Sequence, residues 1–550
     1  MSSHEPLILT NGHFFTGTGA ATTLPDTSLV IKDGKIAYIG PADSPALLPY
    51  STVPKHDLKG QYVLPSFIDA HTHFLLLGQS LAKVQLDGCK DLTEIRHRIS
   101  SYAAKNPDKQ RILCSGWMHS MTAGQAKASM LDDLTDKPIY IDSKDLHSCW
   151  CNSAALQEMG VQGMQDPAGG SIERDEEGKA SGLLSEACVL LIVWPHLAKV
   201  LSVDEKLASL KAGIKAYHEV GCTGFIDMAM DENAWEAILA LRKAEGGKLP
   251  LRIAAHWCIN PGDGEAHRLQ QVDRAIELAG LYNAFKTPDL RIVGIKLICD
   301  GVIDACTAAL AEPYTTNVAS PEPIWTPLML DPVVKKACEA NLQCALHAIG
   351  DLAVHNAINA LETHGKPGQR HRIEHLELTA PEDAARLGKL GITASIQPVH
   401  ADPAILRAWP ALLGADRLKR AFAYKDFADH GATLAIGSDA PTAPHPPLRN
   451  VYVATTRKSA RQPHEGDLPV NENFKVGIAE AVSAGTLGAA YSCFAEHRVG
   501  SLEVGKEADF VVVDMNFEAE ELLAARVVQT WFAGEKVYDA VEGVVEEPRI

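Results

Sequence analysis

Two histidines, His71 and His73, stand one residue apart directly after an apolar run at residues 62–70. Side chains in a strand alternate between its two faces, so both imidazoles would point to the same side. A packed core favours apolar side chains at such positions, whereas imidazole is a common metal ligand. Any histidine-rich strand can produce this pattern, so the pair indicates a metal site only if further ligands join it.

Four more polar residues stand at or near the ends of apolar runs. They are Lys296 in GIKLICDG, His347 in LHAIGD, His375 in RIEH and Asp439 in GSDAP. Taken singly, a buried histidine is more often a hydrogen-bonded core residue, a strand-end lysine reaches solvent, and an aspartate caps a turn. If all these runs end at one edge of one sheet, the side chains converge, and a metal centre becomes the simplest interpretation.

The apolar runs alternate with helical patterns along the chain. Patterns such as DEKLASLKAGIKAYHEVG and ENAWEAILALRKAE lie between successive runs. Eight runs with helices between them predict a parallel (β/α)8 TIM-like barrel of the α/β class, with its active site at the carboxyl ends of the strands. The expected strands are residues 62–70, 223–228, 252–257, 293–298, 345–349, 372–376, 392–398 and 433–437.

At 550 residues the chain exceeds one ordinary core, so a second, smaller domain is expected. Residues 1–60 and 498–550 both contain short strand patterns, and Asp33-Gly34 indicates a hairpin. These segments predict a β-sandwich built from both ends of the chain, with the barrel at residues 61–497. The first two barrel strands are too far apart for one helix, so an insertion at about residues 75–215 is expected as a lid or substrate-facing subdomain.

Composition and charge exclude several classes of function. The net charge of -18 argues against nucleic-acid binding, which usually needs a basic face. No apolar stretch approaches the roughly 20 residues of a membrane span. The first residues have neither a basic start nor an apolar segment, and the twelve cysteines form no CxxC pair. These features predict a cytoplasmic protein with free thiols and no nucleic-acid or membrane partner; a small-molecule substrate is implied only by the family resemblance described next.

The strand-end motifs, taken together, resemble a known group of enzymes. VLPSFIDAHTH, GIKLICDG, LHAIGD, RIEH and GSDAP resemble, in this order, the amidohydrolase superfamily of metal-dependent hydrolases, and GSLEVGKEADFVVVD resembles its closing β-sandwich segment. DLHSCWCNSAAL, GGSIERDEEGKASGLLSE and SIQPVH resemble the YtcJ-like branch, amidohydrolase family 3, which includes N-substituted formamide deformylases. The resemblance covers nearly the whole chain and is compatible with a homodimer, but the branch is too diverse chemically to name the substrate.

The resemblance implies a role for each strand-end residue. The first-strand histidines, with the aspartate, would hold one divalent metal ion, and the histidines of the fifth and sixth strands would hold a second. The lysine would bridge both ions after carboxylation by CO2, because a free ammonium has no lone pair. The aspartate would take a proton from the attacking water and pass it to the leaving nitrogen. The implied metal ligands are His71, His73, Lys296, His347, His375 and Asp439.

The number and identity of the metal ions stay open at this point. Imidazole and carboxylate ligands suit zinc most simply, but Mn, Fe or Co fit as well. If Lys296 stays uncarboxylated, the site would hold one ion rather than two.

Further residues are expected to contact the substrate. His147 lies in a branch motif within the insertion and would contact the substrate or its oxyanion. Trp117 and Trp150 would line an apolar pocket or, equally, pack in the core of the insertion. Gln397 and His400 follow the seventh strand and would reach the substrate.

Arg372 and Glu374 stand on the same strand as His375. They alternate with the face that carries His375, so we expect them to pack or form ion pairs outside the barrel.

Three different functions are considered for this pattern of residues. The first is hydrolysis of an amide C–N bond in a small molecule, such as an N-substituted formamide. The second is ring deamination with one metal ion, but Gly350 stands three residues after His347, where related deaminases place a glutamate. The third is a non-catalytic binding protein, which the full ligand set disfavours. The sequence contains neither the HExxH motif of zinc proteases nor the GxSxG motif of serine hydrolases, so neither of these hydrolase chemistries is indicated.

Overall fold

The computed structural model describes residues 5–18, 23–144, 146, 148–167, 170–186, 188–262, 264–315, 321–464 and 468–541. The chain divides into two compact units, which we call the barrel unit and the insertion unit. The barrel unit joins Met1–Phe74, Ile214–Asp231 and Arg242–Ile550, and the insertion unit joins Leu75–Gly213 with Glu232–Leu241.

The barrel unit is built on eight parallel strands whose order in the sheet follows their order in the chain. Each apolar run expected to form a barrel strand contributes to one of them, so the expected α/β barrel is confirmed. The strands are β6 (Phe67–Thr72), β13 (Cys222–Met230), β14 (Arg252–Cys258), β15 (Leu290–Ile298), β16 (Gln343–Ala348), β17 (Arg372–His375), β18 (Thr393–Ile396) and β19 (Leu434–Ile436).

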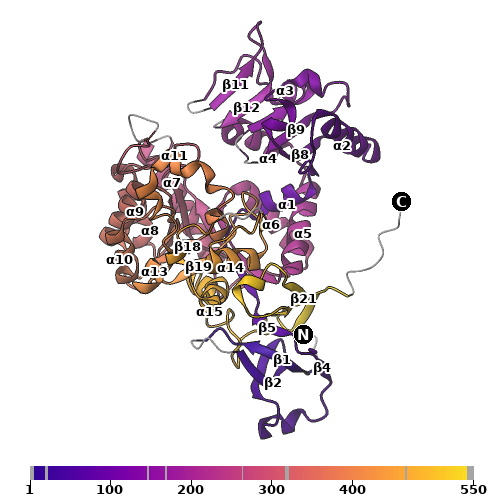
Figure 1. Ribbon diagram of the computed structural model, residues 1–550, viewed down its shortest axis with the longest axis vertical. Helices are drawn as coiled ribbons and strands as arrows, with labels where there is room; N and C mark the ends of the chain where they lie inside the picture. The colour runs from indigo at the N-terminus through magenta and orange to yellow at the C-terminus, as the bar shows by residue number, and fades with distance from the viewer. Residues whose placement is uncertain are drawn as a thin grey trace. The chain divides into compact units, whose positions relative to one another are not determined.

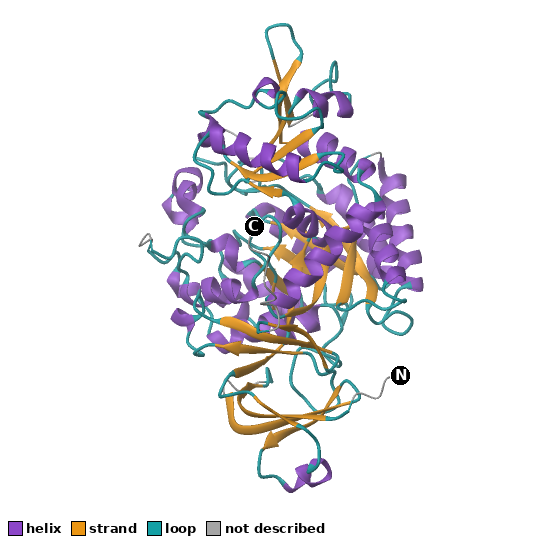
Figure 2. Ribbon diagram, turned by 90° about the vertical axis from the view of Figure 1, so that its right-hand side faces the viewer, coloured by secondary structure: helices purple, strands orange, loops and turns teal. Residues whose placement is uncertain are grey.

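Helices enclose the barrel strands (Figure 2). Helix α9, for example, packs against β16 and buries Val354, Ile358 and Leu361, which lie on one face at helical spacing. In Figure 1 the helices α8, α9 and α10 lie along one side of the barrel. The helices of this unit are α7 (Gly264–Leu281), α8 (Pro327–Glu339), α9 (Asp351–His364), α10 (Pro381–Leu390), α11 (Trp409–Leu413), α12 (Ala415–Leu418), α13 (Tyr424–Asp429), α14 (Pro447–Thr456), α15 (Ile478–Ser483) and α16 (Ala489–Ser492).

The barrel closes at the carboxyl ends of its first and last strands. Thr72 and Ala440 form a parallel bridge, and the Asp439 N–H donates to the His71 carbonyl at 2.7 Å. Gly437 makes this approach possible, because a Cβ at that position would lie 2.3 Å from the His71 nitrogen. Closure therefore places the two predicted metal-ligand motifs directly beside each other.

Substituting Gly437 with alanine is expected to lower the free energy of unfolding by about 1–3 kcal/mol, the usual cost of overpacking a tight interior. Gly280→Ala near the end of α7 is the matched control, because its Cβ meets nothing within 4 Å. That control is expected to be neutral or to stabilise by up to about 1 kcal/mol through helix propensity. Urea unfolding measures both variants, and equal stabilities would contradict the close approach.

Strands from both ends of the chain pair in a second sheet, ordered β22-β21-β20-β5-β1-β2-β3, with β4 beside β1. The hairpin expected at Asp33-Gly34 is confirmed: Lys32 pairs with Lys35, and the two turn residues have φ of 52° and 75°. Tyr62–Pro65 pairs with β1 and β20, so the expected first barrel strand at 62–70 was wrong in its first half. The strands are β1 (Leu7–Phe15), β2 (Thr23–Lys32), β3 (Lys35–Pro41), β4 (Lys55–Asp57), β5 (Tyr62–Pro65), β20 (Phe510–Asp514), β21 (Arg526–Phe532) and β22 (Glu535–Asp539).

The insertion unit has a six-stranded sheet of its own, ordered β11-β12-β10-β9-β8-β7, and two clusters of buried apolar side chains. Helices α5 (Val203–Glu219) and α6 (Glu232–Ala244) contribute residues to both units. The other elements of the insertion unit are α1 (Phe74–Ala82), β7 (Val84–Gln85), α2 (Leu92–Lys105), β8 (Ile112–Trp117), β9 (Ile139–Ser143), β10 (Ser148–Cys151), α3 (Ser153–Met159), β11 (Gly170–Arg174), β12 (Ala180–Glu186) and α4 (Trp194–Val200).

Nowhere in the described ranges is a helix both long and apolar enough to cross a membrane.

Candidate metal centre

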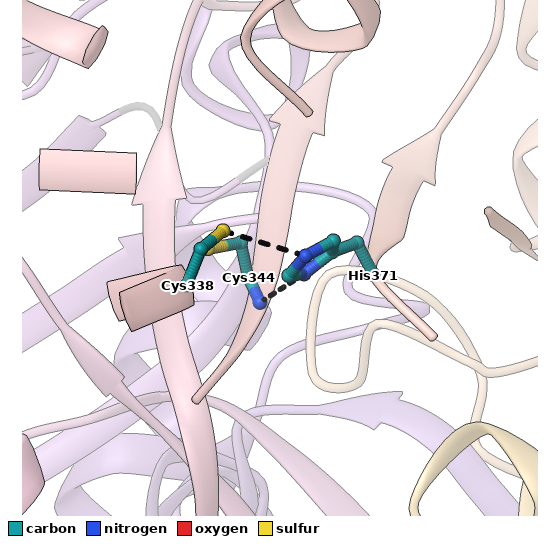
Figure 3. A group of neighbouring side chains, drawn as sticks. All are labelled: Cys338, Cys344 and His371. Atoms are coloured by element: carbon teal, nitrogen blue, oxygen red, sulfur yellow. Dashed lines mark hydrogen bonds between the residues drawn. The ribbon is translucent and has the colours of Figure 1, made fainter. Parts of the chain in front are cut away.

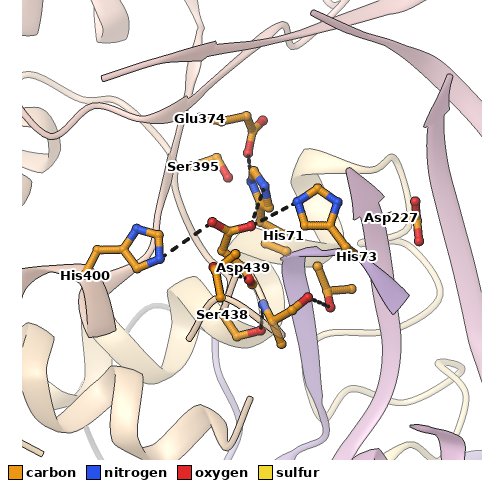
Figure 4. Close-up of polar contacts among 12 residues, drawn as sticks. His71, His73, Asp227, Glu374, Ser395, His400, Ser438 and Asp439 are labelled. Atoms are coloured by element: carbon orange, nitrogen blue, oxygen red, sulfur yellow. Dashed lines mark hydrogen bonds and ion pairs between the residues drawn. The ribbon is translucent and has the colours of Figure 1, made fainter. Parts of the chain in front are cut away.

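His71 on β6 and His73 directly after it meet Asp439, which follows β19 (Figure 4). His73 Nε2 lies 3.1 Å, and His71 Nε2 3.4 Å, from Asp439 Oδ1. A residue of β6 holds the loop that carries Asp439: Ser438 donates hydrogen bonds from both its N–H and its hydroxyl to Asp69. Asp439 itself has a φ of 59°, a left-handed conformation that aspartate tolerates better than most residues and that is common at functional sites.

Two buried nitrogens at this place, His71 Nε2 and His375 Nδ1, have no hydrogen-bond partner among the described residues, and Asp439 Oδ1 faces His73 and His71 only at ion-pair distances. His71 donates its Nδ1 proton to Glu374 at 2.7 Å, so its Nε2 presents a lone pair toward an aspartate oxygen. Two buried acceptors that face each other are unfavourable unless a cation lies between them. The residues therefore fit a metal ion.

Two groups of candidate ligands share the aspartate. His71, His73 and Asp439 form the first, and His375, His400 and Asp439 form the second. Within each group the donor atoms lie within 4.8 Å of one another. His375 reaches the second group from a φ of 78°, which turns it out of the regular strand alternation of β17. His400, expected as a substrate contact, is thus also a candidate metal ligand.

His347 lies beside the second group. Its ring packs against that of His375, with centroids 4.3 Å apart, but its Nε2 lies 3.5 Å from both the Gly301 carbonyl and Asp300 Oδ1. Burial, with the charge of Lys296, lowers the pKa of His347 to about 3, so the ring is neutral and keeps a lone pair that could bind a metal ion.

Glu374 and Arg372 are buried inside the barrel, so the expectation that they face outward was wrong. Arg372 donates to the Ala70 carbonyl and to the Ser395 hydroxyl, both at 2.7 Å, and to Glu374 at 2.8 Å. Ala70 lies on β6, across the barrel from β17, so the guanidinium crosses the interior. Burial alone would raise the pKa of Glu374, but the charge of Arg372 and the hydrogen bond from His71 hold it well below its usual range.

A second buried carboxylate, that of Glu377, supports His400 as Glu374 supports His71. Glu377 Oε1 lies 3.1 Å from His400 Nδ1, and His400 Nε2 lies 3.6 Å from Asp439 Oδ2. Burial alone would lower the pKa of His400, but Glu377 raises it. Carboxylates behind His71 and His400 would fix the tautomer of each ring, as carboxylates behind metal-bound histidines do. The signal in the sequence was two acids on either side of His375 in the strand-end segment RIEHLEL.

Lys296 lies on β15 and is 1% exposed. Burial lowers the pKa of its ammonium, while the charges of Glu374 and Asp439 oppose that shift. Both carboxylates belong to the cluster around His71, so the lysine faces the same interior as the candidate ligands.

Two aspartates that sequence reasoning passed over tie the strand ends together. Asp300 accepts backbone N–H bonds from Ile349 at 3.0 Å, Gly350 at 2.8 Å and Ala309 at 3.1 Å, which holds the loop after β15 against the loop after β16. Burial raises the pKa of Asp300 to about 7. Asp227 accepts the Phe74 N–H at 3.1 Å and so anchors the chain directly after His73.

The remaining expected substrate contacts lie in different surroundings. Gln397 is 2% exposed, and its side-chain amide has no hydrogen-bond partner within the described part of the chain. It stands two residues after Ser395, whose hydroxyl accepts a hydrogen bond from Arg372 inside the barrel. Trp117 and Trp150 are fully buried in one apolar cluster of the insertion unit, with ring centroids 5.4 Å apart. His147 lies outside the described residues.

Replacing Glu374 with glutamine is expected to weaken metal binding about 10–100-fold, as loss of a carboxylate behind a metal-bound histidine does. Glu362→Gln is the matched control, because that carboxylate pairs with Arg386 on the surface. Competition with a chromophoric chelator measures the affinity of both variants. Equal affinities would show that Glu374 does not support His71.

Comparison with known proteins agrees with this geometry. The model of the amidohydrolase family Amidohydro_3 matches residues 56–538. The chain belongs to this amidohydrolase family. A metal-dependent hydrolase of uncharacterised function from Pyrococcus furiosus shares the fold, with a TM-score of 0.77 and 26% identity over 93% of this chain and 99% of that one.

Three relatives from a plant and from bacteria align with most of this chain. The Arabidopsis thaliana protein LONG AFTER FAR-RED 3 is 29% identical and covers 97% of this chain and 91% of its own length. The Bacillus subtilis amidohydrolase family protein YtcJ is 29% identical over 88% of this chain and 90% of its own length. The N-substituted formamide deformylase of Arthrobacter pascens is 23% identical over 93% and 95%. The expected membership of the YtcJ-like branch of metal-dependent hydrolases is confirmed.

Proposed function

We propose that this amidohydrolase cleaves an amide C–N bond of a small molecule with one or two divalent metal ions, most simply zinc. The observation that carries the proposal is the set of histidine and aspartate ligand atoms that meet around Asp439, of which His71 Nε2 and His375 Nδ1 are buried without a hydrogen-bond partner in the described part of the chain. When bound, such ions would lower the pKa of a water molecule and polarise the substrate carbonyl.

The chain's own residues supply orientation and proton transfer. Glu374 and Glu377 hold His71 and His400 in the tautomers whose Nε2 faces the centre. Asp439 would accept the proton of the attacking water on a carboxylate oxygen and return it to the leaving nitrogen, which needs a proton to depart as an amine. The same carboxylate belongs to both ligand groups, so it lies next to the bond to be cleaved.

Lys296 is proposed to carry a carbamate formed with CO2. A carbamate has two oxygens and could join two ions, whereas an ammonium has no lone pair. Its buried place on β15, facing the carboxylates around His71, supports this assignment. In that case His347 and His375 would serve the second ion together with His400.

An amide as the substrate is supported by two observations. The Arthrobacter relative is an N-substituted formamide deformylase, which suggests formamides as the first compounds to test. The partnerless amide of Gln397 could hydrogen bond to a polar group of the substrate, because both its oxygen and its nitrogen are buried without a partner in the described ranges.

The test combines metal content with a substrate panel. The protein is purified in buffer with bicarbonate, and metal per chain is measured by elemental analysis for wild type and for the His71→Ala/His73→Ala variant. We expect one to two ions per wild-type chain and fewer in the variant. Turnover of N-substituted formamides or other small amides, lost after chelation and restored by zinc, would support the proposal. Turnover of esters alone, or ammonia release from a ring substrate, would overturn it.

A further inference from the structure

A second cluster of ligand-type side chains, Cys338, Cys344 and His371, lies at the amino ends of strands β16 and β17 (Figure 3). Cys338 lies in the last turn of α8, Cys344 at the start of β16, and His371 directly before β17. All three are buried, at 1%, 0% and 5% exposure, and their donor atoms lie within 4.8 Å of one another. The cluster lies just beneath the surface, because Glu339 and Asn341 beside it are exposed.

The hydrogen bonds of His371 argue against a metal ion in this cluster. The backbone N–H of Cys344 donates to His371 Nδ1 at 3.0 Å, so that nitrogen carries a lone pair. A neutral imidazole must then hold its proton on Nε2. Nε2 faces Cys338 Sγ at 3.5 Å and Gln369 Oε1 at 3.1 Å, both of which can accept that proton in a hydrogen bond. The nitrogen nearest the sulfur is therefore a donor and not a metal ligand.

The same contacts distinguish the two sulfurs. Cys338 can accept hydrogen bonds from the Cys344 thiol and from His371, which together lower the pKa of Cys338 to about 5 although burial opposes the shift. The pKa of Cys344 is raised, because its thiol donates to Cys338 and is buried. A sulfur that ionises readily beside one that keeps its proton is the arrangement of an attacking thiolate and a resolving thiol.

A second pair of cysteines in the chain provides an internal comparison. Cys149 and Cys151 lie on one strand, β10, with sulfurs 3.6 Å apart. Both belong to the buried apolar core of the insertion unit. The Cys149 thiol has its pKa raised by its hydrogen bond with Cys151 and by burial. The two sulfurs lie close together in both pairs. The pKa of Cys338 is lowered, whereas that of Cys149 is raised.

We propose that Cys338 and Cys344 are a redox-active pair that a hydroperoxide converts to a disulfide, with His371 as the hydrogen-bond donor that positions and stabilises the Cys338 thiolate. The Cys338 sulfur attacks one oxygen of hydrogen peroxide, the O–O bond breaks, and the departing hydroxide takes a proton to become water. The Cys344 sulfur then attacks the sulfenic acid, the S–O bond breaks, and a second water leaves with the Cys344 proton. Two thiols and one peroxide thus give one disulfide and two waters.

The test uses full-length protein treated with hydrogen peroxide at pH 7. Free thiols are then blocked with N-ethylmaleimide in denaturant, and the protein is digested with trypsin. Cleavage after Lys336 and Arg370 releases a peptide that contains Cys338 and Cys344 and no other cysteine. We expect this peptide to be unlabelled and two hydrogen atoms lighter, and dithiothreitol to restore both labels. The peptide with Cys149 and Cys151 is expected to stay labelled.

Two variants test the separate roles. Cys344→Ser is expected to stop at a sulfenic acid on Cys338, which dimedone traps. His371→Asn is expected to form the disulfide at least tenfold more slowly at pH 7, and the difference should shrink at high pH, where the Cys338 thiol ionises unaided. A purely structural histidine would slow the reaction equally at every pH.

Three results would overturn the proposal. The first is full labelling of Cys338 and Cys344 while other cysteines are oxidised. The second is a flat pH dependence of the difference between His371→Asn and wild type. The third is an equivalent of zinc that wild type holds and Cys344→Ser loses, which would make the cluster a metal site.

Discussion

Asp439→Asn is expected to reduce kcat/KM for the best amide of the substrate panel by at least about 10³-fold, since loss of general base catalysis alone costs about 10²–10⁴-fold. Asp439 belongs to both groups of candidate ligands, so the substitution also removes a negative charge from the proposed metal centre. The asparagine amide can fill the same space, and the barrel is expected to stay folded. Steady-state kinetics and metal content per chain are measured on the same preparation.

Asp416→Asn is the control for this substitution, because that carboxylate lies on the surface and pairs with Lys419. It is expected to change neither rate nor metal content. An Asp439→Asn protein that binds metal normally but does not turn over would assign the aspartate mainly to proton transfer. One that keeps both the wild-type rate and its metal would contradict the proposed centre.

The barrel could be predicted from the sequence because its strands are buried on both faces. Such strands appear as short apolar runs, and each expected run contains or overlaps an observed strand. The start of the first strand was missed for the same reason. Tyr62–Pro65 and Phe67–Thr72 are equally apolar and separated only by Ser66, so the sequence does not show that the chain passes there from one sheet to another.

The candidate ligands could be predicted for a similar reason, since polar residues at the ends of apolar runs are conspicuous. The supporting residues were harder to find, because a regular alternation placed Arg372 and Glu374 on the outer face. The φ of 78° at His375 breaks that alternation, so Glu374 and His375 can both serve the interior. A backbone conformation of this kind leaves no mark in the residue types.

Some side chains have surroundings that only the fold determines. A tryptophan in a core and a tryptophan in a pocket have the same sequence pattern, and Trp117 proved to lie in an apolar cluster of the insertion unit. His400 was predicted to reach the substrate, whereas its place beside His375 depends on the short 3₁₀ helix Pro398–Ala401 that follows β18. Short helices after strands have no clear periodicity to predict them.

Arg372→Met is expected to lower the free energy of unfolding by about 3–5 kcal/mol, the range for removing one partner of a buried ion pair. The guanidinium is completely buried and donates to Glu374, to the Ala70 carbonyl and to two serine hydroxyls. Methionine fills much of the volume but leaves the buried Glu374 carboxylate without its guanidinium partner. Chemical unfolding, followed by far-UV circular dichroism, measures the change.

Arg274→Met provides the surface control, because its pair with Glu277 on α7 is exposed and such pairs contribute about 0–1 kcal/mol. The double variant Arg372→Met/Glu374→Gln carries the sharper test. If the cost comes from an uncompensated carboxylate, the double variant is expected to be less destabilised than the sum of the two single variants. Strict additivity would mean that Arg372 acts through its bonds to Ala70 and the serines alone. In that case Glu374 would be held by His71, and stability and metal binding at this end of the barrel would be separable.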